Sequence, residues 1–264
     1  MYFKLIIFSL LFTIIFSSED TFASSTEPIL ITISPNMEKV IFDGKWTFFT
    51  EWKESSLTQV SFDDKQIILR TAHFENFIYV FVDSINDYTL DKGMDKATIC
   101  FDGQNNKSKI PDKNDYCFSS TLGYKQGIVF QGGSVSAISG NFQKISNPDG
   151  FIAISSVSDE NDRYTKIPHP SYEFKIPIDL IQRSNNYGFY LSVYDAGSDT
   201  FYNFPKETIR ENLLKIPSPS LWGDIISPDK SLPELNLPIM VFTILIFTII
   251  LVQSKVRIGI FRWQ

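Results

Sequence analysis

The stretch QIILRTAHFENFIYVFVD, residues 66–83, decides the fold class of this chain. It contains two runs, 66–72 and 77–83, that are rich in β-branched and aromatic residues, as strands are. Residues 73–76 separate the two runs by a connection short enough for a β-hairpin. The sequence therefore predicts that these runs pair as antiparallel strands.

Similar short apolar or alternating runs recur along the chain and are separated by Asn, Asp, Gly, Ser and Pro. They cover residues 29–33, 97–101, 127–131, 151–157, 172–176, 189–194 and 200–203. This spacing predicts an all-β fold, an antiparallel β-sandwich of jelly-roll-like type. Helical signals are confined to one short turn at 177–181 and two to three turns at 206–214, so we expect one or two short helices. About 210 residues suit a single domain of this class.

The first 23 residues read as a signal peptide. Residues 2–16 are apolar except for Lys4, and the small residues Thr21 and Ala23 suit a signal peptidase. We therefore expect the mature chain to begin near Ser24 and its β-sandwich to span residues 24–215.

The last 49 residues read as a stalk, a membrane segment and a tail. Residues 216–236 are rich in proline, which favours a semi-rigid stalk. Trp222 within it is either a membrane-interface aromatic or a ring that folds back onto the domain. Residues 237–254 are predicted to span the membrane, and the basic tail 255–264 then lies in the cytoplasm. The chain is thus expected to be a single-pass cell-surface protein with an extracellular N-terminal domain.

A second interpretation of the C-terminus stays open. The apolar run itself covers residues 237–252, and these sixteen residues as a helix reach only about 24 Å, whereas a hydrocarbon core is about 30 Å thick. Residues 232–235 (LPEL), followed by an apolar run and a basic end, resemble the Pro-Glu-Phe type sorting signals of archaeal exported proteins. In that case the segment is removed during anchoring. Both interpretations place the domain outside the cell.

The net charge and the two cysteines limit the classes of function that the chain can have. Without its two end segments the chain keeps 20 of 24 basic and 28 of 30 acidic residues, a net charge of −8, which disfavours nucleic acid as a partner. Outside the cytoplasm, Cys100 and Cys117 are most simply a disulfide, worth about 3 kcal/mol by chain entropy. Two unpaired buried thiols are the alternative, and a Cys/His nucleophile pair is a weaker one.

Several motifs, taken in order, resemble those of family 9 carbohydrate-binding modules and the related DOMON-like β-sandwiches. They are FDGK at 42–45 with Glu51-Trp52, the hairpin at 69–83, DKATICFD at 95–102, YEFKIPIDL at 172–180, and VYD at 193–195 with Phe204-Pro205. Ile178 departs from the Trp of many relatives, and the pair of rings that encloses a terminal sugar is not identifiable. The resemblance implies a β-sandwich and non-catalytic binding of carbohydrate or cell-envelope glycan.

Four aromatic residues in or beside loops are candidates for ligand binding, because their rings can stack on the C–H faces of sugars. They are Trp46, Tyr88, Tyr124 and Tyr164. Packing in the core or at its rim is the alternative for each ring.

The loop 83–95 is the most carboxylate-rich segment and can supply several oxygen ligands to Ca²⁺. The candidate metal ligands are Asp87, Asp91, Asp95 and Asp102, and Asp112, Asn114 and Asp115 add oxygens in the next loop. The alternative is that these residues form turns. Asn106 begins an N-glycosylation sequon, Asn106-Lys107-Ser108.

The signatures of common enzymes are missing from the sequence, which has neither a His-x-x-x-His zinc pair, a G-x-S-x-G elbow nor a phosphate-cradling glycine loop. We therefore expect a binding protein and not an enzyme. Because some DOMON-like relatives bind haem b through Met and His or Lys, a surface electron carrier is one alternative, with Met37, Met94, His73 and His169 as candidate ligands. A structural or adhesion module without a small ligand is the other.

Overall fold

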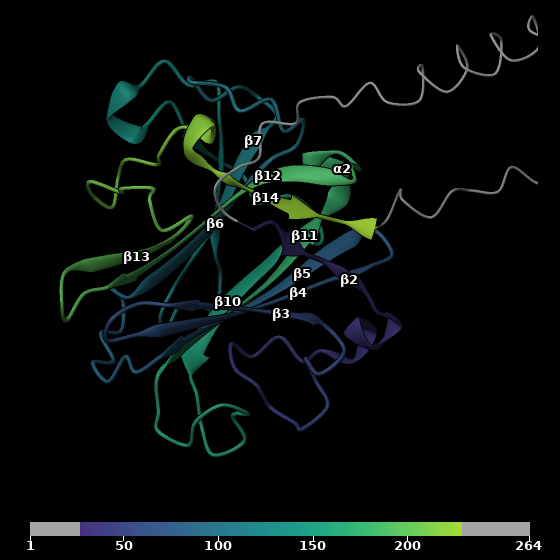
Figure 1. Cartoon of the computed structure of the whole chain (residues 1–264), viewed down its shortest axis with the longest axis vertical. Coiled ribbons are helices and arrows are strands. Elements are labelled where there is room, and N and C mark those ends of the chain that lie inside the picture. The colour runs from purple at the N-terminus through teal and green to yellow at the C-terminus, as the bar shows by residue number, and fades with distance from the viewer. Residues whose placement is uncertain (1–26, 229–264) are drawn as a thin grey trace, which may run out of the picture.

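The computed structural model describes residues 27–228, which fold into two β-sheets packed face to face (Figure 1). This confirms the predicted all-β sandwich with few short helices. The predicted signal peptide, the segment 237–254 and the basic tail 255–264 lie outside the described residues. Within 27–228 no helix has the length and apolar character needed to span a membrane.

The eight-stranded sheet has the order β1-β14-β12-β6-β7-β8-β9, and β13 pairs with β12. Only β1 and β14 run parallel in it; its other pairs are antiparallel. The strands are β1 (Ile29–Leu30), β6 (Lys96–Asp102), β7 (Asp115–Thr121), β8 (Ile128–Gln131), β9 (Gln143–Ile145), β12 (Asn186–Asp195), β13 (Thr200–Phe204) and β14 (Gly223–Ile226).

The six-stranded sheet has the order β10-β11-β5-β4-β2, and β3 pairs with β4. Its strands are β2 (Thr32–Ile33), β3 (Ser56–Ser61), β4 (Gln66–Phe74), β5 (Phe77–Ile85), β10 (Ile152–Val157) and β11 (Pro170–Pro177). The predicted hairpin is confirmed, because β4 and β5 pair along their whole length from Gln66↔Ile85 to Phe74↔Phe77.

The described helices are short. They are α2 (Ile178–Ile181), as expected for residues 177–181, and the 3₁₀ helices η1 (Pro35–Lys39), η2 (Ala137–Ser139) and η3 (Pro219–Leu221). The predicted strand 29–33 is divided between the sheets, because β1 pairs with β14 and β2 pairs with β4. One extended segment thus ties the two sheets together at their edge.

Apolar clusters lie on both sides of the sandwich as well as inside it. The main cluster fills the space between the sheets. A second, including Trp46, Trp52 and Phe81, covers the outer face of β4 and β5. A third, including Cys100, Cys117 and Trp222, covers the outer face of β6, β7 and β12. The central strands are therefore buried on both faces, which explains the long apolar runs in β4 and β5. β7 is equally buried but carries Asp, Ser and Thr among its apolar residues.

The predicted disulfide is confirmed: Cys100 and Cys117 are bonded and lie directly opposite each other on β6 and β7. The predicted helix at 206–214 is wrong, since this segment has no helical turn. The Asn203 side chain donates to Thr208 O, a carbonyl that a helix over these residues would use. The Arg210 guanidinium donates to the carbonyls of Asn212 and Leu213 and so holds the following residues in a loop.

The segment predicted to begin the stalk belongs to the domain as far as residue 228. Its Ile216 and Trp222 are buried, and Trp222 stacks against Phe142 and Tyr190 with 6.2 Å between ring centroids in each pair. The indole N–H donates to Pro217 O at 3.1 Å. Strand β14 follows at once and pairs with β12 and β1. The prolines therefore lie in a connection that covers the sheet, and residues 229–236 lie outside the described part.

Candidate functional site

The strand pairing brings five loops to one end of the sandwich. β4 begins and β5 ends there, opposite each other at Gln66↔Ile85. β11 begins beside the end of β5, while β6 begins beside the ends of β7 and β12. The loops at this end are 62–65, 86–95, 122–127, 158–169 and 196–199. We call it the loop end. The described chain leaves at the other end, because Ile226 lies opposite Asn186, the first residue of β12.

An open recess lined by aromatic and charged residues lies beside this end, on the outer side of the six-stranded sheet. It has a volume of about 420 Å³ and is lined by Trp46, Phe49, Asn161, Asp162, Arg163, Tyr164 and Lys166. Phe49 is 67% exposed, and the cationic groups of Lys53 and Arg163 lie 5.2 and 5.3 Å from its ring centroid. This aromatic recess thus offers an accessible ring flanked by hydrogen-bond donors.

The floor of the aromatic recess is packed and hydrogen-bonded. Trp46 is 1% exposed, meets Tyr164 edge to face at 6.0 Å, and donates its indole N–H to Phe48 O. The Arg70 guanidinium lies against both rings, and its Nε donates to the Tyr164 hydroxyl at 2.8 Å. Because these polar atoms are already paired, Trp46 and Tyr164 hold the shape of the recess, whereas Phe49 faces outward.

A buried carboxylate anchors the segment that carries Trp46 and Phe49. Glu173 on β11 is fully buried and accepts hydrogen bonds from the N–H groups of Asp43 and Gly44, at 2.9 and 2.7 Å. Its other oxygen accepts from the Trp52 indole at 3.1 Å. Gly44 has φ +91°, and a Cβ there would lie 2.3 Å from the backbone of Ser155. Residues 43–52 are therefore fixed to the sheet at two points.

A buried acid–histidine cluster supports the other wall. His169 is fully buried, and its Nε2 lies 2.6 Å from Asp83 Oδ1. Its Nδ1 lies 2.8 Å from Ile167 O, which can only accept, so a proton on Nδ1 donates there. Asp162 Oδ1 accepts from the N–H groups of Tyr164 and Thr165. The cluster thereby holds loop 158–169 in place.

The charges of this cluster shift each other's titration. Burial by itself lowers the pKa of His169, but the hydrogen bond and charge of Asp83 outweigh it and raise this pKa to about 9. Burial raises the pKa of Asp83 to about 6, against the opposing effect of His169. At neutral pH the pair is therefore a buried ion pair.

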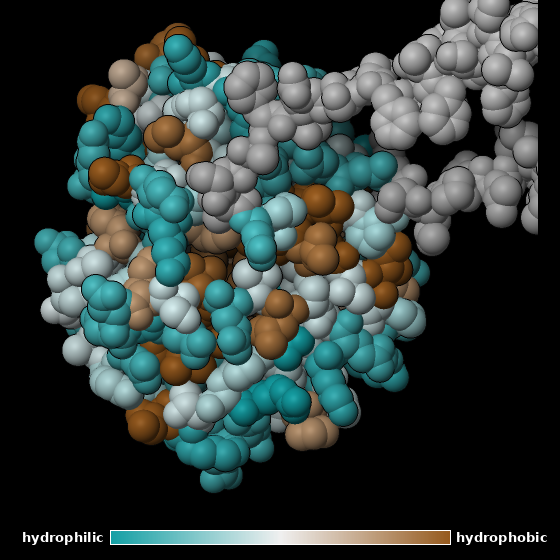
Figure 2. Space-filling view, viewed as in Figure 1, coloured by the Kyte–Doolittle hydropathy of each residue, from teal (hydrophilic) through white to brown (hydrophobic). Residues whose placement is uncertain are grey.

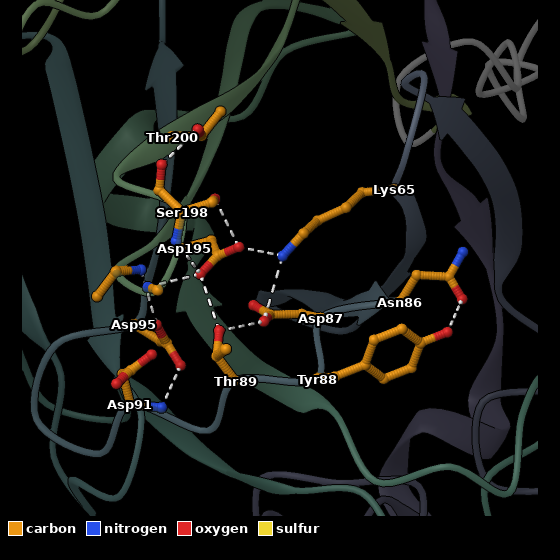
Figure 3. A network of polar contacts seen from close by, with 12 residues as sticks. Lys65, Asn86, Asp87, Tyr88, Thr89, Asp91, Asp95, Asp195, Ser198 and Thr200 are labelled. Carbon is orange, nitrogen blue, oxygen red and sulfur yellow. Dashed lines mark hydrogen bonds and ion pairs between the residues drawn. The ribbon is translucent and has the colours of Figure 1, made fainter.

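A second polar network lies at the loop end and joins the two sheets (Figure 3). Lys65 Nζ donates to Asp195 Oδ2 and lies 3.2 Å from Asp87 Oδ1. Thr89 bridges the two carboxylates through its hydroxyl, at 3.2 Å from an oxygen of each. Asp95 accepts from the N–H groups of Asp91 and Ala196. Burial raises the pKa of Asp95 to about 6.

The predicted metal ligands divide between the two ends of the sandwich. Asp87 and Asp95 meet at the loop end, together with Asp195, and Asp91 lies next to them. Asp102 lies at the other end of β6, roughly 20 Å away at about 3.3 Å per residue, and accepts from the N–H groups of Gln104 and Lys107. Asp102 is thus apart from the other three.

Two buried groups have donor atoms close enough to hold a metal ion. They are Asp83, Asp162 and His169, and Asp87, Asp95 and Asp195, with ligand atoms within 4.8 Å of one another in each group. Within the described part, Oδ2 of Asp83, Asp87 and Asp162 has no hydrogen-bond partner. The donor types thus fit a cation, but the Lys65 ammonium already lies against Asp87 and Asp195.

The predicted ligand-binding aromatics are likewise divided. Trp46 and Tyr164 meet in the aromatic recess. Tyr88 and Tyr124 lie on loops 86–95 and 122–127 of the loop end and are 61% and 57% exposed. Phe49 and Arg163 were not predicted as site residues. Phe49 lies in an aromatic-rich turn beside Phe48 and Trp52, and only the structure shows that its ring is the exposed one, at 67%.

The residues considered for haem lie apart. His73 pairs with Ile78 near one end of β5, whereas His169 bonds to Asp83 near the other, roughly 17 Å along the strand. Met37 is buried in the cluster around Trp52, and Met94 is 53% exposed. The two histidines are therefore not a ligand pair in this fold.

Other surface features lie toward the end where the chain leaves. Asn106 of the sequon is exposed, and its side chain donates to Asp112 and accepts from the Ser108 N–H. A cavity of about 400 Å³ nearby is lined by the segments 137–141 and 209–221 and by Lys109 and Pro111. On the face shown in Figure 2, hydrophobic residues are interspersed with hydrophilic ones.

No protein-family profile matches the sequence, and no curated protein matches it. Among solved structures the chain is similar to a family 9 carbohydrate-binding module from Caldicellulosiruptor kristjanssonii in complex with cellotriose. The identity is 14%, the match covers 76% of this chain and 93% of that one, and the TM-score is 0.49. A structure of a family 9 module from the same organism with glucose matches at 12% identity over 76% and 95% of the chains, also with a TM-score of 0.49. The family that the sequence motifs resemble is therefore also the family of these structures.

Proposed function

We propose that residues 27–228 form a non-catalytic module that binds carbohydrate, with the aromatic recess as its site. The observation that carries this proposal is the exposed Phe49 ring beside Tyr164, within reach of Asn161, Arg163 and Lys166. Aromatic faces pack against the apolar C–H faces of sugar rings, while amide and cationic groups bond their hydroxyls. A recess of about 420 Å³ is within the size range of small-ligand sites.

The rigidity of the aromatic recess supports the same proposal. Its floor is a packed indole, one wall is fixed through Glu173, and the other is fixed through Asp162 and His169. A site that is already ordered loses little conformational entropy when a ligand binds. Binding of a neutral, weakly hydrophobic ligand benefits most from such preorganisation.

The position of the aromatic recess supports a protein that presents its binding site to the surroundings of the cell. It lies toward the loop end, whereas the described chain leaves at the opposite end, toward residues 229–264. If residues 237–254 anchor the chain, the recess is directed away from the anchor. We therefore propose a cell-surface module that binds extracellular or cell-envelope glycan.

The test is a binding series with Phe49→Ala. The purified protein is titrated calorimetrically with soluble oligosaccharides chosen from a screen of insoluble and soluble polysaccharides. We expect Phe49→Ala to weaken binding about tenfold, equivalent to about 1.4 kcal/mol, because the stacking face is lost. Its melting temperature should stay at the wild-type value, since Phe49 is 67% exposed.

Tyr88→Ala and Tyr124→Ala are the matched controls, because both remove similarly exposed rings outside the recess. They should leave the affinity unchanged. Weaker binding in these variants but not in Phe49→Ala would move the site to the loop end. Failure of the wild-type protein to bind any polysaccharide in the screen would favour a structural or adhesion module.

A further inference from the structure

Lys65 and Asp195 lie in contact across the two sheets in a buried setting. Lys65 precedes β4 of the six-stranded sheet, and Asp195 ends β12 of the eight-stranded sheet. The two side chains are 6% and 3% exposed, and Nζ donates to Asp195 Oδ2. Asp87, 1% exposed, lies on the other side of the ammonium at 3.2 Å (Figure 3). A lysine is thus enclosed between two carboxylates.

Aromatic rings exclude water from this site. Lys65 Nζ lies 5.3 Å from the ring centroid of Tyr202, and Phe62 meets that ring edge to face at 5.0 Å. Burial raises the pKa of the fully buried Tyr172 well above its ordinary value, and the negative charges of Asp95, Asp87 and Asp195 add to this effect. Two opposite charges in such a place are costly, and conversion into one neutral group removes that cost.

The two oxygens of Asp195 have different surroundings. Oδ1 accepts from the N–H groups of Gly197 and Ser198, at 2.8 and 3.2 Å, and from the Thr89 hydroxyl at 3.2 Å. Oδ2 faces the Lys65 amine and accepts from the Ser198 hydroxyl at 2.7 Å. Fixed N–H donors at Oδ1 would stabilise negative charge that develops on it during attack at the carboxyl carbon. Oδ2 is the oxygen placed to leave.

Asp87 is placed to carry protons. Its Oδ1 is the atom near Lys65, and its Oδ2 has no hydrogen-bond partner within the described residues. Burial raises the pKa of Asp87, although Lys65 opposes this. For Lys65, burial lowers the pKa while the two carboxylates outweigh it and raise it. The ion pair is therefore the starting state, and a neighbouring carboxyl that accepts and returns protons is what its reaction needs.

We propose that Lys65 and Asp195 form an intramolecular isopeptide bond with Asp87 as the proton carrier. Asp87 takes a proton from the Lys65 ammonium, and the lone pair of the neutral amine attacks the carboxyl carbon of Asp195. Negative charge moves to Oδ1. Asp87 returns this proton to Oδ2. It then takes a second proton from the nitrogen and passes that proton to Oδ2 as well. The C–Oδ2 bond breaks and one water leaves. Ammonium and carboxylate become amide and water, so atoms and charge balance without a cofactor or oxidant.

The same chain offers an internal comparison. Lys45 Nζ also donates to a carboxylate, that of Asp159, but these side chains are 28% and 32% exposed. Water stabilises both charges there, so this pair should remain ionic. The bond at Lys65 would join residues 130 positions apart and fasten β4 to β12. It would hold the loop end together under force or in denaturant, independently of whether the recess binds a sugar.

The test is peptide mapping of the purified full-length protein by mass spectrometry after reduction of the disulfide. We expect one cross-linked tryptic peptide pair that contains Lys65 and Asp195 and is lighter than the two linear peptides by one water. Peptides cleaved after Lys65 should be missing, whereas Lys45 and Asp159 should be found only in linear peptides. On a denaturing gel the cross-linked chain should migrate faster than Lys65→Arg, because a closed loop is more compact.

Three variants test the role of Lys65 as the bonded residue, the role of Asp87 as the proton carrier, and Lys45 as the control. Lys65→Arg and Asp87→Asn should each give only linear peptides, and Lys45→Arg should keep the cross-link. Recovery of Lys65 and Asp195 of the wild-type protein in linear peptides would overturn the proposal, and this outcome does not depend on the folding of any variant. A cross-link that persists in Asp87→Asn would overturn the role of Asp87. Linear peptides together with a melting temperature that Ca²⁺ raises and EDTA lowers would overturn it in favour of a metal site.

Discussion

The buried pair His169–Asp83 should make this protein less stable in mild alkali. In the unfolded chain a histidine has a pKa near 6.5, whereas the pair raises the pKa of His169 to about 9 in the folded protein. Between these values the folded state holds a proton that the unfolded state has lost. The free energy of unfolding should therefore fall as pH rises through this window, by about 3 kcal/mol in total.

Asp83 does not offset this fall. Its folded-state pKa is about 6, above the ordinary 3.8, so its contribution to stability is present below pH 3.8 and lost by about pH 6. The same direction holds for Asp115, whose pKa burial raises to about 7. Above pH 7.5 both carboxyls are mostly ionised in the folded and the unfolded chain alike. Burial also raises the pKa of Glu173 well above its ordinary value, and this contributes a fall of the same sign. The part due to the His169–Asp83 pair is therefore obtained by comparison with a variant.

The measurement is urea unfolding at several pH values between 7 and 9.5, followed by tryptophan fluorescence, since Trp46, Trp52 and Trp222 are buried. His169→Gln alone would remove the charge that lowers the pKa of Asp83, so the variant used is His169→Gln/Asp83→Asn, which lacks both titrating groups of the pair. Its unfolding free energy should fall less steeply with pH than that of the wild type. His73→Gln replaces the other histidine of the chain and should keep the wild-type slope. The reasoning is refuted if wild-type stability is constant over this range or if the double variant falls as steeply as the wild type.

Three further predictions concern the packing that supports the recess and the sheets, each measured as the free energy of urea unfolding. Replacing both Cys100 and Cys117 by Ser should lower it by about 3 kcal/mol, since the closed loop spans 17 positions. Trp222→Ala should cost about 3 to 5 kcal/mol, because the ring is 4% exposed; a loss below about 1 kcal/mol would place it in a loose surface segment. Gly44→Ala should cost more than about 2 kcal/mol, because φ is +91° and a Cβ would lie 2.3 Å from the backbone of Ser155. Gly93→Ala should cost about 1 kcal/mol, because φ is similar at +85° but the nearest atom to a Cβ lies 3.8 Å away. Equal losses for the two glycines would contradict this.

The sequence predicts most strands because their apolar character is local. The runs that became β4, β5 and β12 are buried on both faces, so nearly every residue in them is apolar or small. β3 was not predicted, since Ser56–Ser61 is an edge strand whose burial alternates with exposure. β14 was not predicted because prolines precede and follow it, and only its pairing with β12 shows that they belong to the domain. The central strand β7 was missed as well, although it is buried along its whole length, because Ser119, Ser120 and Thr121 interrupt its apolar character. The sequence therefore identifies apolar strands, and it misses strands with many polar residues whether they are central or at an edge.

The candidate sites depend on contacts between distant residues, which a local pattern does not contain. Asp83 meets His169 across 86 positions, and Lys65 meets Asp195 across 130. The density of carboxylates in loop 83–95 predicts a calcium site. In the fold, Lys65 from another loop supplies the positive charge next to Asp87 and Asp195. The partner of a buried charge is decided by strand register, and one-residue shifts in register would change it.

The distribution of buried charge connects the two proposals made for this protein. Glu173, the His169 cluster and the Lys65 network lie under or beside the aromatic recess and the loop end, and each takes an ionisable group out of water. Glu173 is held by hydrogen bonds, whereas the other two contain opposite charges in contact. A charge buried without its partner costs several kcal/mol, so each network allows few arrangements of the loops around it. Apolar packing alone would tolerate small shifts of these loops, because contacts of similar energy can replace one another. If Lys65 and Asp195 are joined covalently as proposed, that bond would add to the paired charges in holding these loops, and with them the proposed binding recess, in one shape.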